Sequence, residues 1–195
     1  MRKIKSFLIT TALSLAVFTL PVGAQAASYT VKSGDSYWNI ANKYGVSVKD
    51  LQNANNRSNA TLYVGETLTI PNQVSSADKK LMAKLIHAEA KGESYAGKVA
   101  VATVILNRVD HKDFPNTVKG VIYEKSGGAY AFTPVQNGSI NQDYNTEDMK
   151  AVNEAIAFRG QGSGSLYFYN PKTAKSTWIL SRKVTVTIGN HRFAK

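Results

Sequence analysis

The run Leu81-Met82-Ala83-Lys84-Leu85-Ile86-His87-Ala88-Glu89-Ala90 decides how the larger part of this chain folds. Met82, Leu85, Ile86 and Glu89 recur at i, i+3, i+4 and i+7, which is the spacing of one face of an α-helix. Lysines occupy the opposite, wet side of the same helical projection. The sequence therefore predicts a helix over 78–90.

Glu89 is the unusual member of this pattern because it continues the apolar stripe. A carboxyl group held against apolar neighbours is disfavoured in its charged form, so we expect its pKa to be raised. A general acid for glycosidic cleavage needs such a pKa. The alternative is a glutamate at a helix end that faces solvent or an arginine.

The chain after this helix predicts a second, buried one. Gly92 interrupts the first helix, Glu93-Ser94 resembles a capping region, and the run 95–109 is apolar on most sides. We expect this run to form the central helix, with Asn107-Arg108 either as polar core residues or as residues that support the site from behind. Glu93 lies one turn after Glu89 and could face the same cleft, but its place before a new helix favours a structural role.

The C-terminal third alternates between helix, open loop and strand. The run 153–158 completes a helix, and three glycines then predict an open loop. Tyr167 and Tyr169 alternate along an extended run, so both rings are expected on one face, where they can bind sugar or pack in the core. Asn170 and Pro171 turn the chain, and 183–188 is predicted to be a strand.

The N-terminal segment 29–72 predicts a separate small unit. Its order of signals is strand, turn, helix, helix, loop and strand, with Ser36 and Ser47 as expected helix caps and Gly45 as the stop of the first helix. We expect Trp38 to be a core residue, because so short a unit needs its large apolar side chains inside. Residues 73–77 form a polar linker, and a second domain follows over 78–195.

Residues 1–26 predict an export leader. A basic start precedes an apolar run from Phe7 to Leu20 and an A-x-A cleavage site, Ala24-Gln25-Ala26. The run is shorter than the roughly 20 residues that a membrane span needs, and no later stretch is long enough. We therefore expect a secreted protein without a membrane span.

Composition narrows the function classes. The net charge is +11, or +8 once the three positive residues of the leader are removed, so the mature chain favours anionic partners. Outside the cell these are wall polymers and lipid headgroups rather than nucleic acid. The chain has no cysteine, which excludes disulfides and thiolate catalysis.

The segment 29–72 closely resembles a LysM domain. The resemblance rests on the run 29–36 (Tyr-Thr-Val-Lys-Ser-Gly-Asp-Ser), on Ile40-Ala41, on Leu51 with the following asparagines, and on the run 64–71. LysM domains bind N-acetylglucosamine-containing glycans between two loops. By position, the resemblance assigns this groove to Gly34, Asp35, Ser36, Tyr37, Asn53, Ala54 and Asn55.

Residues 81–195 resemble the spore cortex-lytic and cell-wall hydrolase family of the SleB/CwlJ type. The matching stretches are 88–93, 97–109, 114–118, 131–135, 167–171 and 188–193, in the order of that family. The resemblance implies a mainly helical, lysozyme-like domain with a small β-hairpin region, and it places the acid at Glu89. The whole chain is thus expected to be α+β, a βααβ module followed by this domain.

The same resemblance implies a reaction and a substrate. Its characterised members cleave between N-acetylmuramic acid and N-acetylglucosamine, largely as lytic transglycosylases, with no cofactor. We expect sugar contacts from Thr133 and Gln136, which can lie opposite the acid in lysozyme-like clefts, and from Tyr167, Tyr169 and Asn170. His191 can face this cleft or pair within the fold. Spore cortex and vegetative wall remain equal candidates as substrate.

Four rival interpretations arise, and two of them lack the motifs they need. A zinc amidase would need more ligands than His87, His111 and His191 provide, so no metal site is predicted. Ser76 and Lys79 form an S-x-x-K pattern, but its partner motifs are missing. The alternatives that stay open are an N-acetylmuramidase that hydrolyses the same bond and a non-catalytic wall-binding protein.

Overall fold

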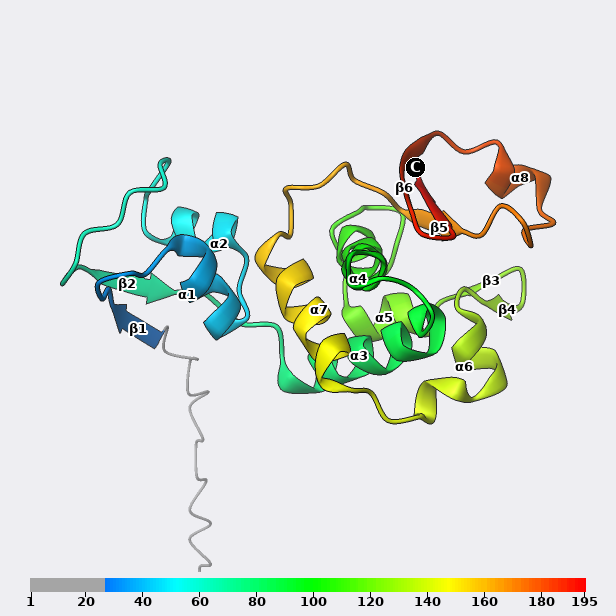
Figure 1. The fold of residues 1–195 in the computed structure, drawn as a ribbon, viewed down its shortest axis with the longest axis horizontal. Coiled ribbons are helices and arrows are strands. Elements are labelled where there is room, and N and C mark those ends of the chain that lie inside the picture. Colours follow the sequence, from blue (N-terminus) through cyan, green and yellow to red (C-terminus); the bar gives the residue numbers. More distant parts are fainter. Residues whose placement is uncertain (1–26) are drawn as a thin grey trace, which may run out of the picture.

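The computed structural model describes residues 27–195 as a small N-terminal module beside a larger helical body (Figure 1). The predicted export leader, residues 1–26, lies outside the described residues. The α+β class and the order of the two parts are as predicted from the sequence.

The module has the predicted βααβ order. Strands β1 (Ala27–Thr30) and β2 (Thr67–Ile70) pair antiparallel, and helices α1 (Tyr37–Tyr44) and α2 (Val48–Ala54) lie between them in the chain. The Ser36 hydroxyl accepts a hydrogen bond from the Asn39 N–H at 3.1 Å, which starts α1. Gly45 ends α1 with φ +65°, a conformation that favours glycine.

Trp38 corrects one expectation, because it is not a core residue. Its side chain is 39% exposed, whereas Tyr37 is 4% exposed and Ile40 and Ala41 are fully buried. One helical turn of α1 can present only one face to the β1–β2 pair. Tyr37, Ile40 and Ala41 occupy that face, so Trp38 is directed to solvent.

The body is built around α4 (Tyr95–Val109), which Figure 1 shows nearly end-on among its neighbours. Its boundaries are those predicted, and its apolar residues form the core with those of α3. Helix α3 (Ser76–Ala90) begins two residues before the predicted start, since the Ser75 hydroxyl caps it by accepting from the Asp78 N–H. The other helices are α5 (Val118–Ile122), α6 (Thr133–Asn137), the short 3₁₀ helix η1 (Ser139–Asn141), α7 (Thr146–Ala157) and α8 (Thr177–Leu180).

A three-stranded antiparallel sheet closes the C-terminal end of the body. Its order is β5 (Tyr167–Tyr169), β7 (His191–Ala194), β6 (Val184–Ile188), with Phe168 opposite Phe193. Phe193 is 1% exposed and joins the core of the body. The central strand β7 was not predicted as a strand. A two-residue hairpin, β3 (Lys125–Ser126) and β4 (Ala129–Tyr130), precedes α6.

The module is packed on α7. Ala157 at the end of α7 is fully buried in the apolar cluster of the module, and α1 contacts α7. The Val74 N–H donates to the Gly45 carbonyl at 3.3 Å, and the Lys79 side chain covers Gly45. Burial lowers the pKa of Lys79. The module is therefore held against the body by buried apolar contacts as well as by the connecting chain.

Asp148, on α7, binds groups from two other helices. It is fully buried, with one carboxylate oxygen 2.8 Å from His87 Nδ1 of α3 and the other 2.9 Å from Lys98 Nζ of α4. Burial alone would raise the pKa of Asp148, but hydrogen bonds from the Asn145 N–H, Lys98 and His87 outweigh it and hold that pKa below its usual range. Lys98 also reaches Glu147 at 2.8 Å.

We predict that Asp148→Ala destabilises the protein by about 3 to 5 kcal/mol, because it leaves the buried Lys98 ammonium without its buried partner. Glu147→Gln is the matched control, since Glu147 binds the same ammonium from a position that is 53% exposed. We expect it to cost less than about 1 kcal/mol. Urea unfolding of the two variants measures both values, and equal costs would contradict the assigned role of Asp148.

Candidate active site

Glu89 lies in the last turn of α3, at the end of a stripe whose other members are wholly buried. Met82, Leu85 and Ile86 each have 0% exposure, and Ala90 after Glu89 is buried as well. Among residues 27–195, no hydrogen bond or ion pair to the Glu89 carboxyl is found. Burial raises the pKa of Glu89 to about 7, in agreement with the apolar stripe.

A carboxyl group with this pKa can serve as an acid and as a base near neutral pH. Near neutral pH both its protonated and its ionised forms are populated, and no cationic side chain of residues 27–195 pairs with the ionised form. These are the properties of a group that gives up a proton and takes one back within one reaction. The chemistry available at the end of α3 is therefore proton transfer.

Glu93 has a different environment although it lies one turn further on. It accepts hydrogen bonds from the Asn190 backbone N–H at 3.2 Å and from Asn190 Nδ2 at 3.3 Å, and its side chain is 8% exposed. Its carboxylate packs so closely on Gly189 that a Cβ there would collide with it, and Gly189 has φ +57°. Glu93 thus fastens the β6–β7 turn to the junction of α3 and α4, as the structural reading predicts.

His191 belongs to the same junction. Its Nδ1 lies 3.4 Å from Glu93, and its ring meets Phe168 edge-on with centroids 5.5 Å apart. The side chain is 13% exposed. Pairing within the fold, one of the two roles expected for His191, accounts for these contacts.

The predicted sugar contacts on α6 are exposed and lie near the helix that carries Glu89. Thr133 begins α6, Gln136 follows one turn later, and both side chains face solvent. Helix α6 contacts α3, and Phe132 just before it is 2% exposed against Phe168. Thr133 and Gln136 therefore remain candidates for sugar binding.

Two of the three candidates on the β5 segment, Tyr167 and Asn170, are partly exposed. Tyr169 is 7% exposed, which corrects its expected role to that of a core residue. Asn170 closes a turn, since its Oδ1 accepts from the Lys172 N–H at 2.9 Å. Tyr167 is half-buried between Phe114 and Trp178, and it remains a candidate.

In the module, the first expected glycan-binding loop is held in shape by its own side chains. Asp35 accepts from the Tyr29 hydroxyl and the Lys32 N–H, both at 2.7 Å, and these bonds lower its pKa. Ser36 caps α1, and Gly34 has φ +86°. Tyr37 is corrected here, because its burial removes its ring from any glycan surface.

The second loop follows the same principle. Asn55 donates from Nδ2 to the Leu51 and Thr69 carbonyls and accepts from the Thr69 N–H, so all its polar atoms are used within the module. Asn53 and Ala54 are exposed beside it. The groups left for a glycan are the backbone of both loops and the Asn53 amide.

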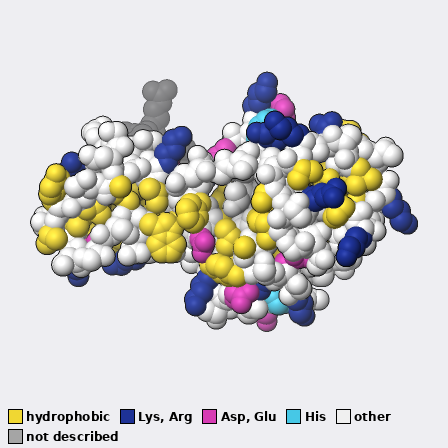
Figure 2. All heavy atoms as spheres, turned by 45° about the horizontal axis from the view of Figure 1, so that its top comes forward, with side chains coloured by type: hydrophobic (Ala, Val, Ile, Leu, Met, Phe, Trp, Pro, Cys, Tyr) yellow, Lys and Arg dark blue, Asp and Glu magenta, His cyan; other side chains and the backbone are white. Residues whose placement is uncertain are grey.

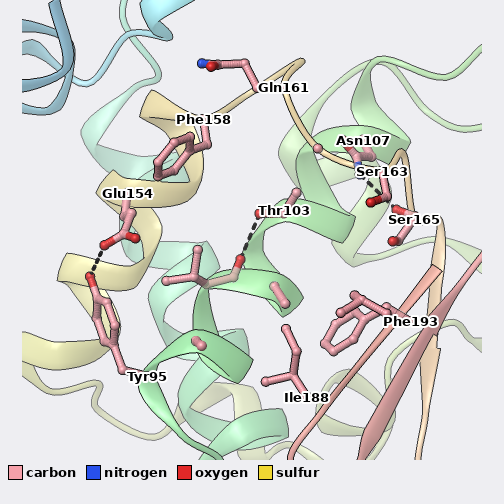
Figure 3. Close-up of a pocket in the computed structure, with 15 residues that line it drawn as sticks. Tyr95, Thr103, Asn107, Glu154, Phe158, Gln161, Ser163, Ser165, Ile188 and Phe193 are labelled. Atoms are coloured by element: carbon pink, nitrogen blue, oxygen red, sulfur yellow. Dashed lines mark hydrogen bonds between the residues drawn. The ribbon is translucent and has the colours of Figure 1, made fainter.

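An apolar pocket of the body is separate from Glu89 (Figure 3). It encloses about 330 Å³ between α4, α7, the glycine loop and β6. Figure 3 shows its polar rim satisfied within the protein: the Tyr95 hydroxyl donates to Glu154 at 2.7 Å and Asn107 Nδ2 to the Ser165 carbonyl at 3.0 Å. No residue of α3 lines it.

Arg108 has the buried position of a polar core residue, whereas Trp178 was not identified from the sequence. Arg108 is 7% exposed, donates from Nε to the Leu166 carbonyl at 2.7 Å, and lies 5.1 Å from the ring centroids of Phe114 and Phe132. Trp178 is 48% exposed. Its position in a short helix between a turn and a strand gave no periodic signal.

Among residues 27–195, no group of three or more histidine, aspartate or glutamate side chains could hold a metal ion. Within the same range, no helix has the length and apolar character needed to cross a membrane.

Comparison with known proteins gives matches over both parts of the chain. The model of the family described as cell wall hydrolase matches residues 92–194, and that of the LysM domain matches residues 29–71. The first segment begins at Gly92, so Glu89 precedes it. The match to the second confirms the LysM prediction.

Individual relatives agree with these matches. The chain is 46% identical over 126 residues to a spore cortex-lytic enzyme of Bacillus cereus and 41% identical over 126 residues to one of Bacillus subtilis. It covers 47% and 40% of those proteins, so it spans at most about half of their length, while 65% of this chain is aligned. The solved catalytic domain of the germination-specific lytic transglycosylase SleB from Bacillus anthracis is 45% identical, with a TM-score of 0.58 over 65% of this chain and all of that domain.

We predict that Glu89→Gln stabilises the protein above pH 7 and leaves stability unchanged near pH 4. Between the ordinary pKa of 4.5 and about 7, the folded state holds a proton that the unfolded state has lost, so native stability falls as pH rises through this window. Glutamine removes that loss, which amounts to at most about 3 kcal/mol.

Urea unfolding at a series of pH values measures the effect. Asp143→Asn is the control, because Asp143 is an exposed carboxylate outside the helices, and we expect no comparable pH-dependent difference. If the free energy of unfolding of Glu89→Gln varied with pH in parallel with that of the native protein, Glu89 would not be held in an apolar environment.

Proposed function

The chain belongs to the cell wall hydrolase family, and from this premise we propose that it degrades peptidoglycan by cleaving the bond between N-acetylmuramic acid and N-acetylglucosamine. Glu89 is the proposed acid. The observation that carries this proposal is a desolvated carboxyl with a pKa of about 7, at a helix end beside α6.

The proposed reaction is that of a lytic transglycosylase. The Glu89 carboxyl protonates the glycosidic oxygen as the bond to the muramoyl C1 breaks, and the carboxylate then takes the proton of the muramoyl C6 hydroxyl as that oxygen bonds to C1. The products are a 1,6-anhydromuramoyl end and a free sugar hydroxyl, and Glu89 regains its proton. No water and no second carboxylate are consumed.

The environment of Glu93 favours this route over hydrolysis. A hydrolase needs a second carboxylate about 5 to 9.5 Å from the acid to act as nucleophile or base. Glu93 is the carboxylate nearest in sequence, and it is engaged by Asn190 in holding the β6–β7 turn. A reaction that uses Glu89 alone fits a transglycosylase, which is also what the Bacillus anthracis SleB domain is.

The LysM module would bind the proposed enzyme to peptidoglycan. Its two loops, with Gly34, Asp35 and Ser36 on one side and Asn53 to Asn55 on the other, would bind N-acetylglucosamine of the same polymer. An exported, wall-associated protein fits this pairing of domains and the basic charge. Both spore cortex and vegetative peptidoglycan are substrates to be compared.

We predict that the chain without residues 1–26 releases fragments with 1,6-anhydromuramic ends from purified peptidoglycan. Glu89→Gln should lower this release about 10²- to 10⁴-fold, because it removes the proposed proton-transfer group. Mass spectrometry of digests of vegetative and spore peptidoglycan measures it. Glu93→Gln is the matched control, for which anhydro ends should persist.

Other products would point elsewhere. Reducing muramic ends would mean hydrolysis by an N-acetylmuramidase. Glu93 would then be tested first as the second carboxylate that hydrolysis needs. Sedimentation with peptidoglycan but no cleavage of either substrate would identify a non-catalytic wall-binding protein.

We also predict that the rate falls about tenfold per pH unit above pH 7, because the first step needs the protonated form of Glu89. Initial rates on solubilised glycan strands from pH 5 to pH 9 measure this alkaline limb. A rate that stays level to pH 9 would exclude Glu89 as the acid.

A further inference from the structure

The segment 170–183 leaves the sheet after β5 and returns at β6, and Figure 1 shows it, with α8, standing away from the helical body. Its central side chain is Trp178, which is 48% exposed. Leu180 on the same helix is 44% exposed, and large apolar side chains that are exposed together mark a binding surface. Trp178 and Leu180 thus mark this segment as a candidate binding surface.

Trp178 is exposed but held in a fixed place. The Tyr167 ring meets it at 87° with centroids 5.1 Å apart, and the Arg182 guanidinium lies 4.6 Å from its centroid. The Ser181 hydroxyl donates to the Trp178 carbonyl at 2.8 Å. A ring held in this way loses little freedom when a ligand stacks on its open surface.

The chain that forms the C-terminal part of the body, in which Trp178 lies, carries charge of one sign. After Glu154 the chain contains no acidic residue, whereas seven basic residues follow: Arg159, Lys172, Lys175, Arg182, Lys183, Arg192 and Lys195. Figure 2 shows Lys and Arg side chains among hydrophobic ones on the side of the body away from the module. An aromatic ring among cations suits a polymer that offers sugar faces together with carboxylates.

A continuous series of contacts leads from Trp178 toward the helix that carries Glu89. Tyr167 lies between Trp178 and the guanidinium of Arg108, which is 5.5 Å from its ring centroid. Arg108 lies 5.1 Å from Phe132, the residue before Thr133 on α6. Helix α6 contacts α3. Trp178 is therefore joined to the candidate sugar contacts rather than to the apolar pocket of Figure 3, which it does not line.

We infer that Trp178 is a sugar-stacking residue of an outer subsite, which binds a pyranose of the glycan strand several sugars from the bond that is cut. Arg182 and the neighbouring lysines would bind the carboxylates that the strand carries on its muramic acid substituents. This inference rests on the proposed function, because it names a further part of the same substrate site. It assigns Trp178 a positioning role and no part in proton transfer.

The chain has two tryptophans, Trp38 and Trp178, so either can be made the sole fluorophore. In Trp38→Phe combined with Glu89→Gln, emission reports on Trp178 alone, and the strand is not cut during the measurement. Peptide-free glycan strands are the probe. We expect their addition to shift the emission to shorter wavelength and to protect Trp178 from acrylamide quenching at least twofold.

The matched control is Trp178→Phe with Glu89→Gln, in which Trp38 of the LysM module is the sole fluorophore. It reports binding by the module and gives the strand concentration at which the protein is occupied. An unchanged Trp178 signal at that concentration would overturn the inference. For an outer subsite, we expect long strands to change the Trp178 emission. A single disaccharide added in place of the strands should leave the emission unchanged.

A kinetic measurement separates this inference from the proposed function. With Glu89 intact, Trp178→Ala should raise KM for long strands about tenfold with kcat nearly unchanged, and Trp178→Phe should restore most of the loss, because a second aromatic ring can stack. A fall in kcat with unchanged KM, or equal effects on long and short substrates, would contradict outer binding. If the intact protein does not cleave glycan strands, the proposed function fails, and if Glu89→Gln still cleaves them, the role of Glu89 fails. The emission of Trp178 tests the subsite independently of both.

Discussion

Asp148 binds Lys98 of α4 and His87 of α3 from a fully buried position on α7, and the arrangement of the helical body depends on this ion-pair network. Apolar packing alone would let three helices slide or rotate with small losses, whereas a buried carboxylate tolerates no displacement that uncovers its charge. His87 is two residues before Glu89 on the same helix and points to another side of it. The network therefore fixes the rotation of α3, and with it the direction in which Glu89 is presented.

The two glutamates at the α3–α4 junction show how environment separates chemically identical groups. Both carboxylate oxygens of Glu93 accept hydrogen bonds from Asn190, and these bonds hold the β6–β7 turn. Glu89, four residues earlier, has apolar neighbours and a pKa near 7. The lone carboxyl can exchange its proton because nothing in the fold is stabilised by its charge, and the paired carboxyl keeps the sheet beside it in place. One group is free for the proposed chemistry, and the other holds β6 and β7 in position.

The sequence predicted those parts of the fold that depend on local rules. Helices α1 and α4 begin and end at the predicted residues because Ser36, Ser94 and Gly45 are caps whose effect reaches only one turn. Predictions that needed knowledge of the opposite surface were less reliable. Trp38 is adjacent to Tyr37 on α1, and only the direction of the β1–β2 pair decides which of them is buried. Tyr169 and Tyr167 share a face of β5, yet the first is covered by the body and the second is at its edge.

The contact of Ala157 with the apolar cluster of the LysM module has a consequence for movement on an insoluble wall. A module on a loose tether could stay bound while the rest of the molecule swept the surrounding polymer. Here α1 rests on α7 and the Gly45 carbonyl accepts from Val74, so the two parts turn together. A wall-attached copy would reach only the strands at one distance and angle from its anchor. Movement across the wall would then depend on how often the LysM module dissociates. A module with low affinity and fast dissociation would allow faster movement than one that binds tightly.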